Sequence, residues 1–452
     1  MSVIFASTPH RQPPPIDAST NARIYISAGA GWTTLAPLAI AVMAPFAMGS
    51  DRPLAWLVWA AVAGGALAIR ALCSSGRKDL RSDGALVPVA MTLGALALLW
   101  AIVQIGPSGI SLDPRAGQLA VLRGLTYGLV FGLALEMANA PAPRRHAIAT
   151  VVVAGAVLHG VVALALLTRW GDSGLWWAKS AYHGVATGGF VNRNALAANL
   201  GMGLLVGLAL LWHGSARGVG RLPELPRWHA PLLTLALVAI FLALLATGSR
   251  MGIASCLAGA GAMAVMRPAR PAPTPCHRWL IATVASGVGL AVLIAQILPR
   301  LAGLGTDWTI RLQLYRQVAG LIAERPLTGH GLDAFALAFQ QVQSPPLPAE
   351  VVWRHAHSAY LSLWAELGLI FGSLPLIALA LIGWRLWQRR AAGDPLGLAA
   401  FGVLVQAAIH STLDFSFQIS GNSFLLLVVL ALGLRAPASP PPRQPLSSEQ
   451  EP

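Results

Sequence analysis

The feature that most constrains this chain is a series of long apolar segments with few charged residues between them. A helix needs about 20 apolar residues to cross the hydrocarbon core of a bilayer. Such windows predict twelve spans, at 31–49, 54–73, 84–105, 116–138, 146–168, 194–213, 230–246, 250–267, 279–298, 357–384, 396–414 and 419–436. Only 11% of the residues are charged, against about 25% in a soluble protein. The chain is therefore predicted to be an all-α integral membrane protein that crosses the lipid bilayer repeatedly.

The distribution of Lys and Arg predicts the orientation, because cytoplasmic loops carry an excess of these residues. With a cytoplasmic N-terminus, the inner segments hold 18 basic residues, and the outer segments apart from 299–356 hold six. Both termini are thus expected in the cytoplasm, with 1–30 and 437–452 as tails, the second of them disordered. The net charge of +14 fits loops that face anionic lipid. Since these charges are scattered, no nucleic-acid partner is expected.

The N-terminal tail and the cysteines exclude two further classes. The stretch "MSVIFASTPHRQPPPIDASTNAR" has no apolar core, so it does not read as a cleavable signal. Cys73, Cys256 and Cys276 have no paired spacing. Neither a disulfide framework, nor a metal site, nor a cofactor is expected.

Two outer segments differ from simple connections. Segment 169–193 is rich in tryptophan, which suits an anchor at the membrane interface. Segment 299–356, between spans 31–298 and spans 357–436, is too long for a plain connector. Its run "DWTIRLQLYRQVAGLIAERPLTGHG" has helical periodicity, with Asp307 as the expected N-cap and Pro326 and Gly329 at the end. It is predicted to be an outer loop that contains short helices.

Arg123 lies about seven residues inside the fourth predicted span, roughly 10 Å from its outer end. A cation at that depth costs a few kcal/mol unless it has an anionic partner or a wet cavity. Glu136 is the nearest acid on the same helix, but it is too far along the helix to reach Arg123. A structural pair and a functional cation remain equally open for this residue.

Arg250 follows "TGS" at the start of the eighth predicted helix. A helix N-terminus together with a bidentate guanidinium makes a good seat for phosphate. The alternative is an arginine that only extends to the interface. Arg311 and Arg316 lie on roughly opposite sides of the outer-loop helix, so at most one of them needs to face a site.

Arg193 lies between two amides, Asn192 and Asn194, at another predicted helix start. Such amides orient a polar ligand, or they simply cap the helix.

Two histidines occur where the outer loop meets the tenth predicted span. His357 is expected to begin that helix, with Tyr360, Leu361 and Trp364 on its face. An imidazole of ordinary pKa, about 6.5, is mostly a free base at neutral pH and can take a proton from a sugar hydroxyl. The alternative is a histidine that only makes hydrogen bonds at the interface. His355 is its closest competitor for the role of base.

A resemblance to a known family rests on four motifs in one order. They are "FVNRNALAANL", "TGSRMG", "RLQLYRQVAGLIAERPLTGHGLDAF" and "HAHSAYLSLWAELGLIFG", and "HSTLDFSFQISGN" follows them. This pattern resembles the O-antigen ligase and polymerase superfamily. The resemblance implies metal-independent membrane glycosyltransferases of GT-C-like fold in the bacterial inner membrane. They move a glycan from undecaprenyl diphosphate, at the periplasmic face, to lipid A–core (ligases), to another lipid-linked repeat (polymerases) or to protein.

The resemblance also implies roles for residues. The family's loop motif falls on His357, Ser358 and Gly368, which makes His357 the catalytic base; Phe371 departs from the motif. The family's arginine element matches at Arg250, with Ala254 in place of a leucine, and Tyr315 replaces a frequent tryptophan. The residues implied to bind the diphosphate are Arg250, Arg311, Arg123, Arg193, Asn192, Asn194 and Arg316. Those that could support the site are His355, Ser358, Tyr360, His330, His410 and Asp414.

Three classes of protein compete for this sequence. A glycosyltransferase that acts by direct displacement, with inversion, explains the arginines, the His357 motif and the outer loop together. A secondary transporter also has twelve helices, but its polar residues belong near the midplane of the membrane. A scaffolding protein explains the apolar segments and not the ordered motifs. Within the first class, the resemblance favours a ligase over a polymerase.

Overall fold

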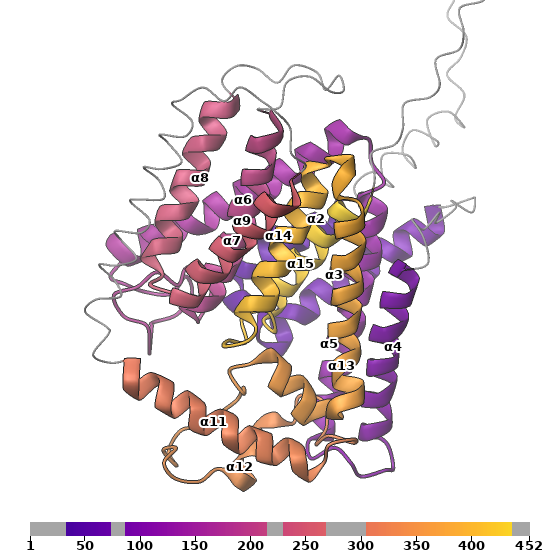
Figure 1. The fold of residues 1–452 in the computed structure, drawn as a ribbon, viewed down its shortest axis with the longest axis vertical. Coiled ribbons are helices and arrows are strands. Elements are labelled where there is room, and N and C mark those ends of the chain that lie inside the picture. Colours follow the sequence, from indigo (N-terminus) through magenta and orange to yellow (C-terminus); the bar gives the residue numbers. More distant parts are fainter. Residues whose placement is uncertain (1–32, 74–85, 215–228, 268–303, 436–452) are drawn as a thin grey trace, which may run out of the picture.

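The structure is a computed structural model that describes residues 33–73, 86–214, 229–267 and 304–435, and within these ranges it consists of helices, turns and loops, without strands (Figure 1). The helices are α2 (Ala36–Met43), α3 (Pro53–Cys73), α4 (Leu86–Ile105), α5 (Pro114–Met137), α6 (Ala142–Thr168), α7 (Arg193–Gly214), α8 (His229–Ala246), α9 (Arg250–Met266), α11 (Leu304–Glu324), α12 (Phe335–Val342), α13 (Ala359–Gln388), α14 (Pro395–His410) and α15 (Ser420–Leu434).

The helices confirm a multi-pass, all-helical membrane protein. Among the described residues, α3 to α7 and α13 are long and apolar enough to cross a membrane, and α2, α8, α9, α14 and α15 are shorter apolar helices. The predicted span at 279–298 and the predicted tails at 1–30 and 437–452 lie outside the described residues.

The first predicted span, 31–49, is less regular than its apolar composition suggests. Helix α2 covers only eight residues, and two short 3₁₀ turns, Ala44–Phe46 and Met48–Ser50, follow it. Pro45 cannot continue an α-helix. Gly49 has φ +71° and lies so close to Phe190 that a Cβ there would be 2.7 Å from its ring. Tertiary packing therefore ends this helix early.

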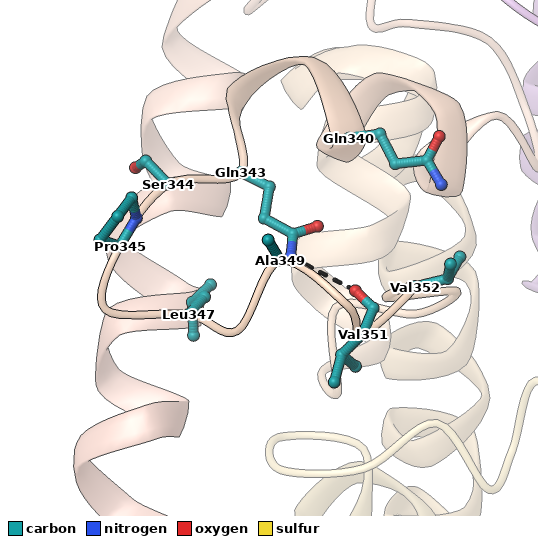
Figure 2. Close-up of a pocket in the computed structure, with 8 residues that line it drawn as sticks. All are labelled: Gln340, Gln343, Ser344, Pro345, Leu347, Ala349, Val351 and Val352. Atoms are coloured by element: carbon teal, nitrogen blue, oxygen red, sulfur yellow. Dashed lines mark hydrogen bonds between the residues drawn. The ribbon is translucent and has the colours of Figure 1, made fainter.

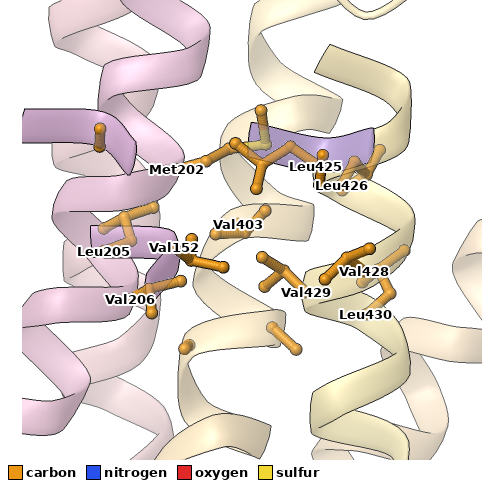
Figure 3. Packing of buried hydrophobic residues seen from close by; sticks show 14 of the residues in the cluster. Val152, Met202, Leu205, Val206, Val403, Leu425, Leu426, Val428, Val429 and Leu430 are labelled. Carbon is orange, nitrogen blue, oxygen red and sulfur yellow. The ribbon is translucent and has the colours of Figure 1, made fainter. Parts of the chain in front are cut away.

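The core of the bundle lies where α7, α14 and α15 meet (Figure 3). Met202, Leu205, Val403 and Val429 are buried there, and α15 is buried along nearly its whole length. By contrast, α3 and α4 carry many exposed large apolar side chains, among them Leu54, Leu72 and Leu99. This distribution is the one expected if α14 and α15 are enclosed by other helices while α3 and α4 face lipid.

Helices α11 and α12 lie together at one end of the bundle, which we call the loop end (Figure 1). Helix α11 begins at Leu304, three residues before Asp307, so the predicted N-cap is wrong. Its end at Glu324, just before Pro326, is as predicted.

Helix α13 is interrupted at Gly368, where φ is +78° and ψ is 169°. The carbonyls of Ala365 and Glu366 accept hydrogen bonds from the backbone N–H groups of His330 and Gly331, both at 3.0 Å. The single span predicted at 357–384 is therefore a short helix at the loop end followed by a long membrane helix. The turn after α11 satisfies the carbonyls that the break exposes.

Candidate functional site

The turn that follows α14 joins the helices of the loop end. The carbonyl of Ser411 accepts a hydrogen bond from Ala359 N at 3.0 Å. The carbonyl of Leu413 accepts one from the Arg311 guanidinium at 2.5 Å. Two carbonyls of one turn thus hold both the start of α13 and the charged face of α11.

His357 lies just before α13 and not within it, which corrects the prediction that it begins the helix. The helix starts at Ala359, and His357 has φ +52°, the left-handed region that non-glycine residues rarely adopt. The shared helical face predicted for it therefore does not exist. Its backbone is held instead by Tyr315, whose hydroxyl donates to the His357 carbonyl at 2.9 Å. Such strained positions cluster at functional sites.

Phe415 packs against both His355 and His357, a role that its position in the sequence did not predict. The His355 ring stacks on Phe415 with centroids 4.1 Å apart and planes 15° apart. His357 meets Phe415 edge to face at 5.2 Å, and Trp353 meets His357 edge to face at 5.8 Å. The only earlier signal was the position of Phe415 in the run "HSTLDFSFQISGN". These aromatic contacts fix where the two imidazoles lie.

The surroundings of His357 keep its imidazole neutral. Burial and, after it, the positive charge of Arg311 lower the pKa of His357 to about 4, although Asp414 opposes the shift. Burial likewise lowers the pKa of His355. The buried Nδ1 of His357 has no hydrogen-bond partner among the described residues. At pH 7 the ring is therefore a free base.

A hydrogen-bond chain joins Asp414 to the start of α9. Asn194 Nδ2 donates to Asp414 Oδ2 at 2.7 Å, and Asn194 Oδ1 accepts from Ser249 Oγ at 2.8 Å. Ser249 caps α9 by accepting from Gly252 N at 3.1 Å. Arg250 is the first residue of that helix, as predicted. The backbone of Arg250 is thus tied to the turn that also contacts the segment around His357.

The two amides that flank Arg193 behave differently: Asn192 caps a helix, whereas Asn194 contacts a residue distant in the sequence. Asn192 Oδ1 accepts from Asn194 N at 2.8 Å, which is a local capping contact at the start of α7. Asn194 reaches further, into the chain that ends at Asp414. The Arg193 guanidinium lies over the ring of Tyr182, 5.6 Å from its centroid.

Arg123 has an acidic partner that the sequence did not predict. Its guanidinium lies 3.3 Å from the carboxylate of Asp333, which comes from the turn before α12. Glu136 forms an ion pair with Arg70 instead. The structure therefore favours the paired reading of Arg123, with an acid from the loop end rather than from its own helix.

Two of the predicted residues, His330 and Tyr360, make hydrogen bonds that brace the fold. His330 Nε2 lies 2.9 Å from the Leu321 carbonyl. The Tyr360 hydroxyl donates to the Ala408 carbonyl at 2.7 Å. Arg316 is exposed, whereas Arg311 is half-buried, which agrees with the expectation that at most one of them faces a site.

Two further predicted residues lie at the turn itself. Ser358 is buried, and its hydroxyl is 3.5 Å from the Ser411 carbonyl. His410 is fully buried, with Nε2 3.8 Å from Asp414 Oδ1, which is too long for a hydrogen bond. Both side chains are buried against residues of this turn.

A cavity of about 260 Å³ lies beside α12 (Figure 2). None of the residues that line it is charged: Gln340, Gln343, Ser344, Pro345, Leu347, Ala349, Val351 and Val352. Gln343 Nε2 donates to the Pro348 carbonyl at 2.7 Å and so fixes the turn around the cavity. Because it contains no cation, this cavity suits a neutral group and not a diphosphate.

The fold and the site define a multi-pass helical membrane protein with a neutral imidazole and several arginines gathered at one end. The O-antigen ligase family model matches residues 235–372, from α8 to the second part of α13. Residues 235–372 thus match the family of O-antigen ligases, which are glycosyltransferases, and this match confirms the resemblance found in the motifs. No curated protein matches the chain.

The packing of Phe415 yields a first prediction. Phe415→Leu removes the aromatic surface that both imidazoles contact, and displacing a catalytic group by about 1 Å costs roughly 100-fold in rate. We expect kcat for glycan transfer to fall by about 10- to 100-fold with KM for the donor unchanged, and Phe415→Tyr to retain most activity. Phe401→Leu, which loses an aromatic contact with Trp387 near the opposite end of α14, is the matched control. Equal rates for Phe415→Leu and Phe401→Leu would refute the positioning role.

Proposed function

We propose that this chain moves a glycan from undecaprenyl diphosphate to the hydroxyl of an acceptor, and that the acceptor is lipid A–core, as in an O-antigen ligase. The family match supports the class of reaction and lipid-linked glycans as substrates. The choice of ligase over polymerase rests on the resemblance alone. The further alternative, a secondary transporter, would move its substrate across the membrane without transferring a glycan.

The proposed reaction is a single displacement. The neutral imidazole of His357 accepts the proton of the acceptor hydroxyl as the acceptor oxygen bonds to the anomeric carbon. The bond from that carbon to the diphosphate oxygen breaks, and undecaprenyl diphosphate leaves with the electron pair. Because attack comes opposite the leaving group, the anomeric configuration inverts. No covalent intermediate is needed.

The observation that carries this proposal is the environment of His357. Its ring is held by Phe415 and Trp353, and it lies within electrostatic reach of Arg311 and Asp414. Both His357 and Arg250 fall inside the matched region, 235–372. A free base next to fixed cations is the arrangement that displacement of an anionic leaving group requires.

We assign the diphosphate to Arg250, Arg311 and Arg193. Arg250 adds its charge to the partial positive charge at the N-terminus of α9. Arg311 is near His357, and Arg193 begins α7. Arg123 is given a secondary role, because Asp333 already compensates its charge. Arg316 is given none, because it is exposed on α11.

The proposed topology places the loop end in the periplasm of a bacterial inner membrane, with both termini in the cytoplasm. It follows the Lys and Arg distribution of the sequence. The full count of twelve spans and the GT-C-like fold belong to the same proposal. The neutral cavity beside α12 is then available to sugars of the donor or the acceptor, which carry hydroxyl groups.

Deletion of the chain in its host separates the two enzyme classes on a lipopolysaccharide gel. Loss of all long-chain material, with the lipid-linked polymer intact, identifies a ligase. A product that carries a single repeat identifies a polymerase. An unchanged lipopolysaccharide pattern contradicts the proposed acceptor.

Two arginines five residues apart on α11 test the diphosphate assignment. Arg311→Ala removes a cation near His357, and we expect kcat/KM for the donor to fall by about 100-fold, in the range seen for one group that stabilises developing charge. Arg316→Ala on the same helix is the matched control, and we expect less than a twofold change. The measurement is transfer in proteoliposomes over a range of donor concentrations. Equal losses in the two variants would contradict the assignment.

A further inference from the structure

The loop at 169–193 is built more firmly than an interfacial anchor requires. Asp172 accepts hydrogen bonds from Lys179 Nζ at 2.5 Å and from Gly184 N at 2.6 Å. Lys179 also donates to the Val185 carbonyl at 2.8 Å, and its side chain is only 3% exposed. A partly buried ion pair with further hydrogen bonds holds residues 172–185 in one conformation, because breaking it would leave the buried charge of Lys179 uncompensated.

The same loop is attached to the bundle at two points. Trp176 Nε1 donates to the Phe46 carbonyl at 2.9 Å. Ala186 N donates to the Ala246 carbonyl at 2.9 Å, next to the turn that leads into α9. The loop is therefore fixed against the helices whose ends form the candidate site.

The residue that this construction places in the site is Tyr182. Its φ is +63°, in the left-handed region that a tyrosine adopts only where its surroundings impose it. Its ring lies under the Arg193 guanidinium at 5.6 Å, and it lies within electrostatic reach of Arg311 and Asp414. Arg311 and Asp414 also act on His357. The loop thus places a phenol in the same charged environment as the proposed base.

The hydroxyl of Tyr182 is available as a donor. Among the described residues it has no hydrogen-bond partner, whereas the hydroxyls of Tyr127, Tyr315 and Tyr360 each have at least one. Burial raises the pKa of Tyr182 above its ordinary value, so the phenol keeps its proton at neutral pH. A half-buried, protonated hydroxyl that lies near Arg193 and within electrostatic reach of Arg311 is suited to an anionic oxygen.

We propose that Tyr182 is a substrate-binding residue whose hydroxyl donates a hydrogen bond to the diphosphate of the lipid-linked donor, beside Arg193 and Arg311. This inference rests on the proposed function and adds the 169–193 loop to its binding site. Arg193 holds the ring, and the ion pair of Asp172 with Lys179 holds the loop. The segment then contributes to substrate recognition in addition to any contact that its tryptophans make with lipid.

The test is the affinity of the full-length chain in lipid nanodiscs for undecaprenyl diphosphate. Tyr182→Phe keeps the ring under Arg193 and removes only the hydroxyl. A hydrogen bond to a charged group contributes enough that its loss should weaken binding by about tenfold or more. Tyr127→Phe, which removes a hydroxyl bonded to Ser420 at 3.0 Å within the bundle, is the matched control and should bind as the parent chain does.

Two further arms identify the group that is recognised. Undecaprenyl monophosphate should bind more weakly than the diphosphate to the parent chain, and the difference should shrink in Tyr182→Phe. Competition by inorganic pyrophosphate separates a headgroup contact from a requirement for the lipid. The inference would be overturned by a Tyr182→Phe variant that elutes from a size-exclusion column as the parent chain does and binds undecaprenyl diphosphate with unchanged affinity. As a second variant, Asp172→Asn loosens the loop and should weaken binding in the same direction.

The outcomes also separate this inference from the proposed function. If the parent chain neither binds undecaprenyl diphosphate nor transfers a glycan, the proposed function fails. If the parent chain does both and Tyr182→Phe matches it in affinity and in KM for the donor, only the role of Tyr182 fails. A loss confined to KM in Tyr182→Phe, with kcat retained, is the result expected of a binding residue.

Discussion

Replacing His357 with alanine is expected to reduce glycan transfer by about 100- to 10,000-fold, the contribution of a positioned general base. The loss should appear in kcat, while undecaprenyl diphosphate still binds, because the arginines that we assign to it are untouched. His357→Gln should be as inactive as His357→Ala, since an amide cannot accept the proton. The measurement is transfer in proteoliposomes together with the affinity for undecaprenyl diphosphate.

The controls for this prediction use other histidines of the chain. His146 lies near the start of α6 and is not part of the candidate site, so His146→Gln should leave transfer unchanged. His355→Gln should lower transfer by much less than His357→Gln, because we assign the base role to His357. Full loss in His355→Gln with activity retained in His357→Gln would reverse that assignment.

The lowered pKa of His357 sets the pH dependence of the same reaction. Activity requires the neutral ring, so it is lost as the pH falls through the pKa of His357. Since that pKa is about 4 in the free protein, kcat/KM for the donor should stay level from pH 8 to about 5 and fall below that. An ordinary histidine would give a midpoint near 6.5. The bound diphosphate adds negative charge, so the acid limb of kcat should lie at higher pH than that of kcat/KM.

Replacing Gly368 with alanine is expected to destabilise the chain by about 2–5 kcal/mol, through backbone strain together with steric overlap. The backbone there has φ +78°, and a Cβ would lie 2.3 Å from the Leu327 carbonyl oxygen. The backbone strain and the steric overlap both act where α13 contacts the turn after α11. The segment that carries His357 lies just before the first part of α13, so transfer should fall as well. The measurement is the midpoint of thermal unfolding in detergent.

Gly320→Ala is the matched control for Gly368→Ala. Gly320 lies inside α11, is exposed, and has nothing within 4 Å of a Cβ built on it. Alanine there should raise stability by roughly 0.5–1 kcal/mol, because it favours the helix. If Gly368→Ala unfolded at the same temperature as Gly320→Ala, the break in α13 could not have the structural role that we give it.

Most of the helices could be predicted from the sequence, because apolar length alone separates a spanning helix from a loop. Helices α8 (His229–Ala246) and α9 (Arg250–Met266) almost coincide with the spans expected at 230–246 and 250–267, since "TGS" contains both the breaker Gly248 and the cap Ser249. The interruptions could not be read in the same way. The breaks near Pro45 and at Gly368 depend on contacts with Phe190, with Leu327 and with the turn after α11, which are distant in the sequence.

The candidate site was predictable in its residue types and less so in its contacts. A lone arginine inside a helix signals a partner, but Asp333 is 210 positions beyond Arg123, and no local pattern links them. The roles of Phe415 and Tyr182 could not be predicted, because aromatic residues are common in interfacial loops. Only spatial neighbours distinguish these two residues: the two imidazoles for Phe415 and Arg193 for Tyr182.

The most direct measurement is the stereochemistry of transfer by the purified chain in proteoliposomes. A synthetic undecaprenyl diphosphate donor with a glycan of known anomeric configuration is supplied together with a lipid A–core acceptor. The new linkage is then read by nuclear magnetic resonance. Our account predicts a product of inverted configuration, formed by the parent chain and not by His357→Ala. A retained configuration, or transfer that survives the loss of His357, would contradict direct displacement by a hydroxyl that this imidazole activates.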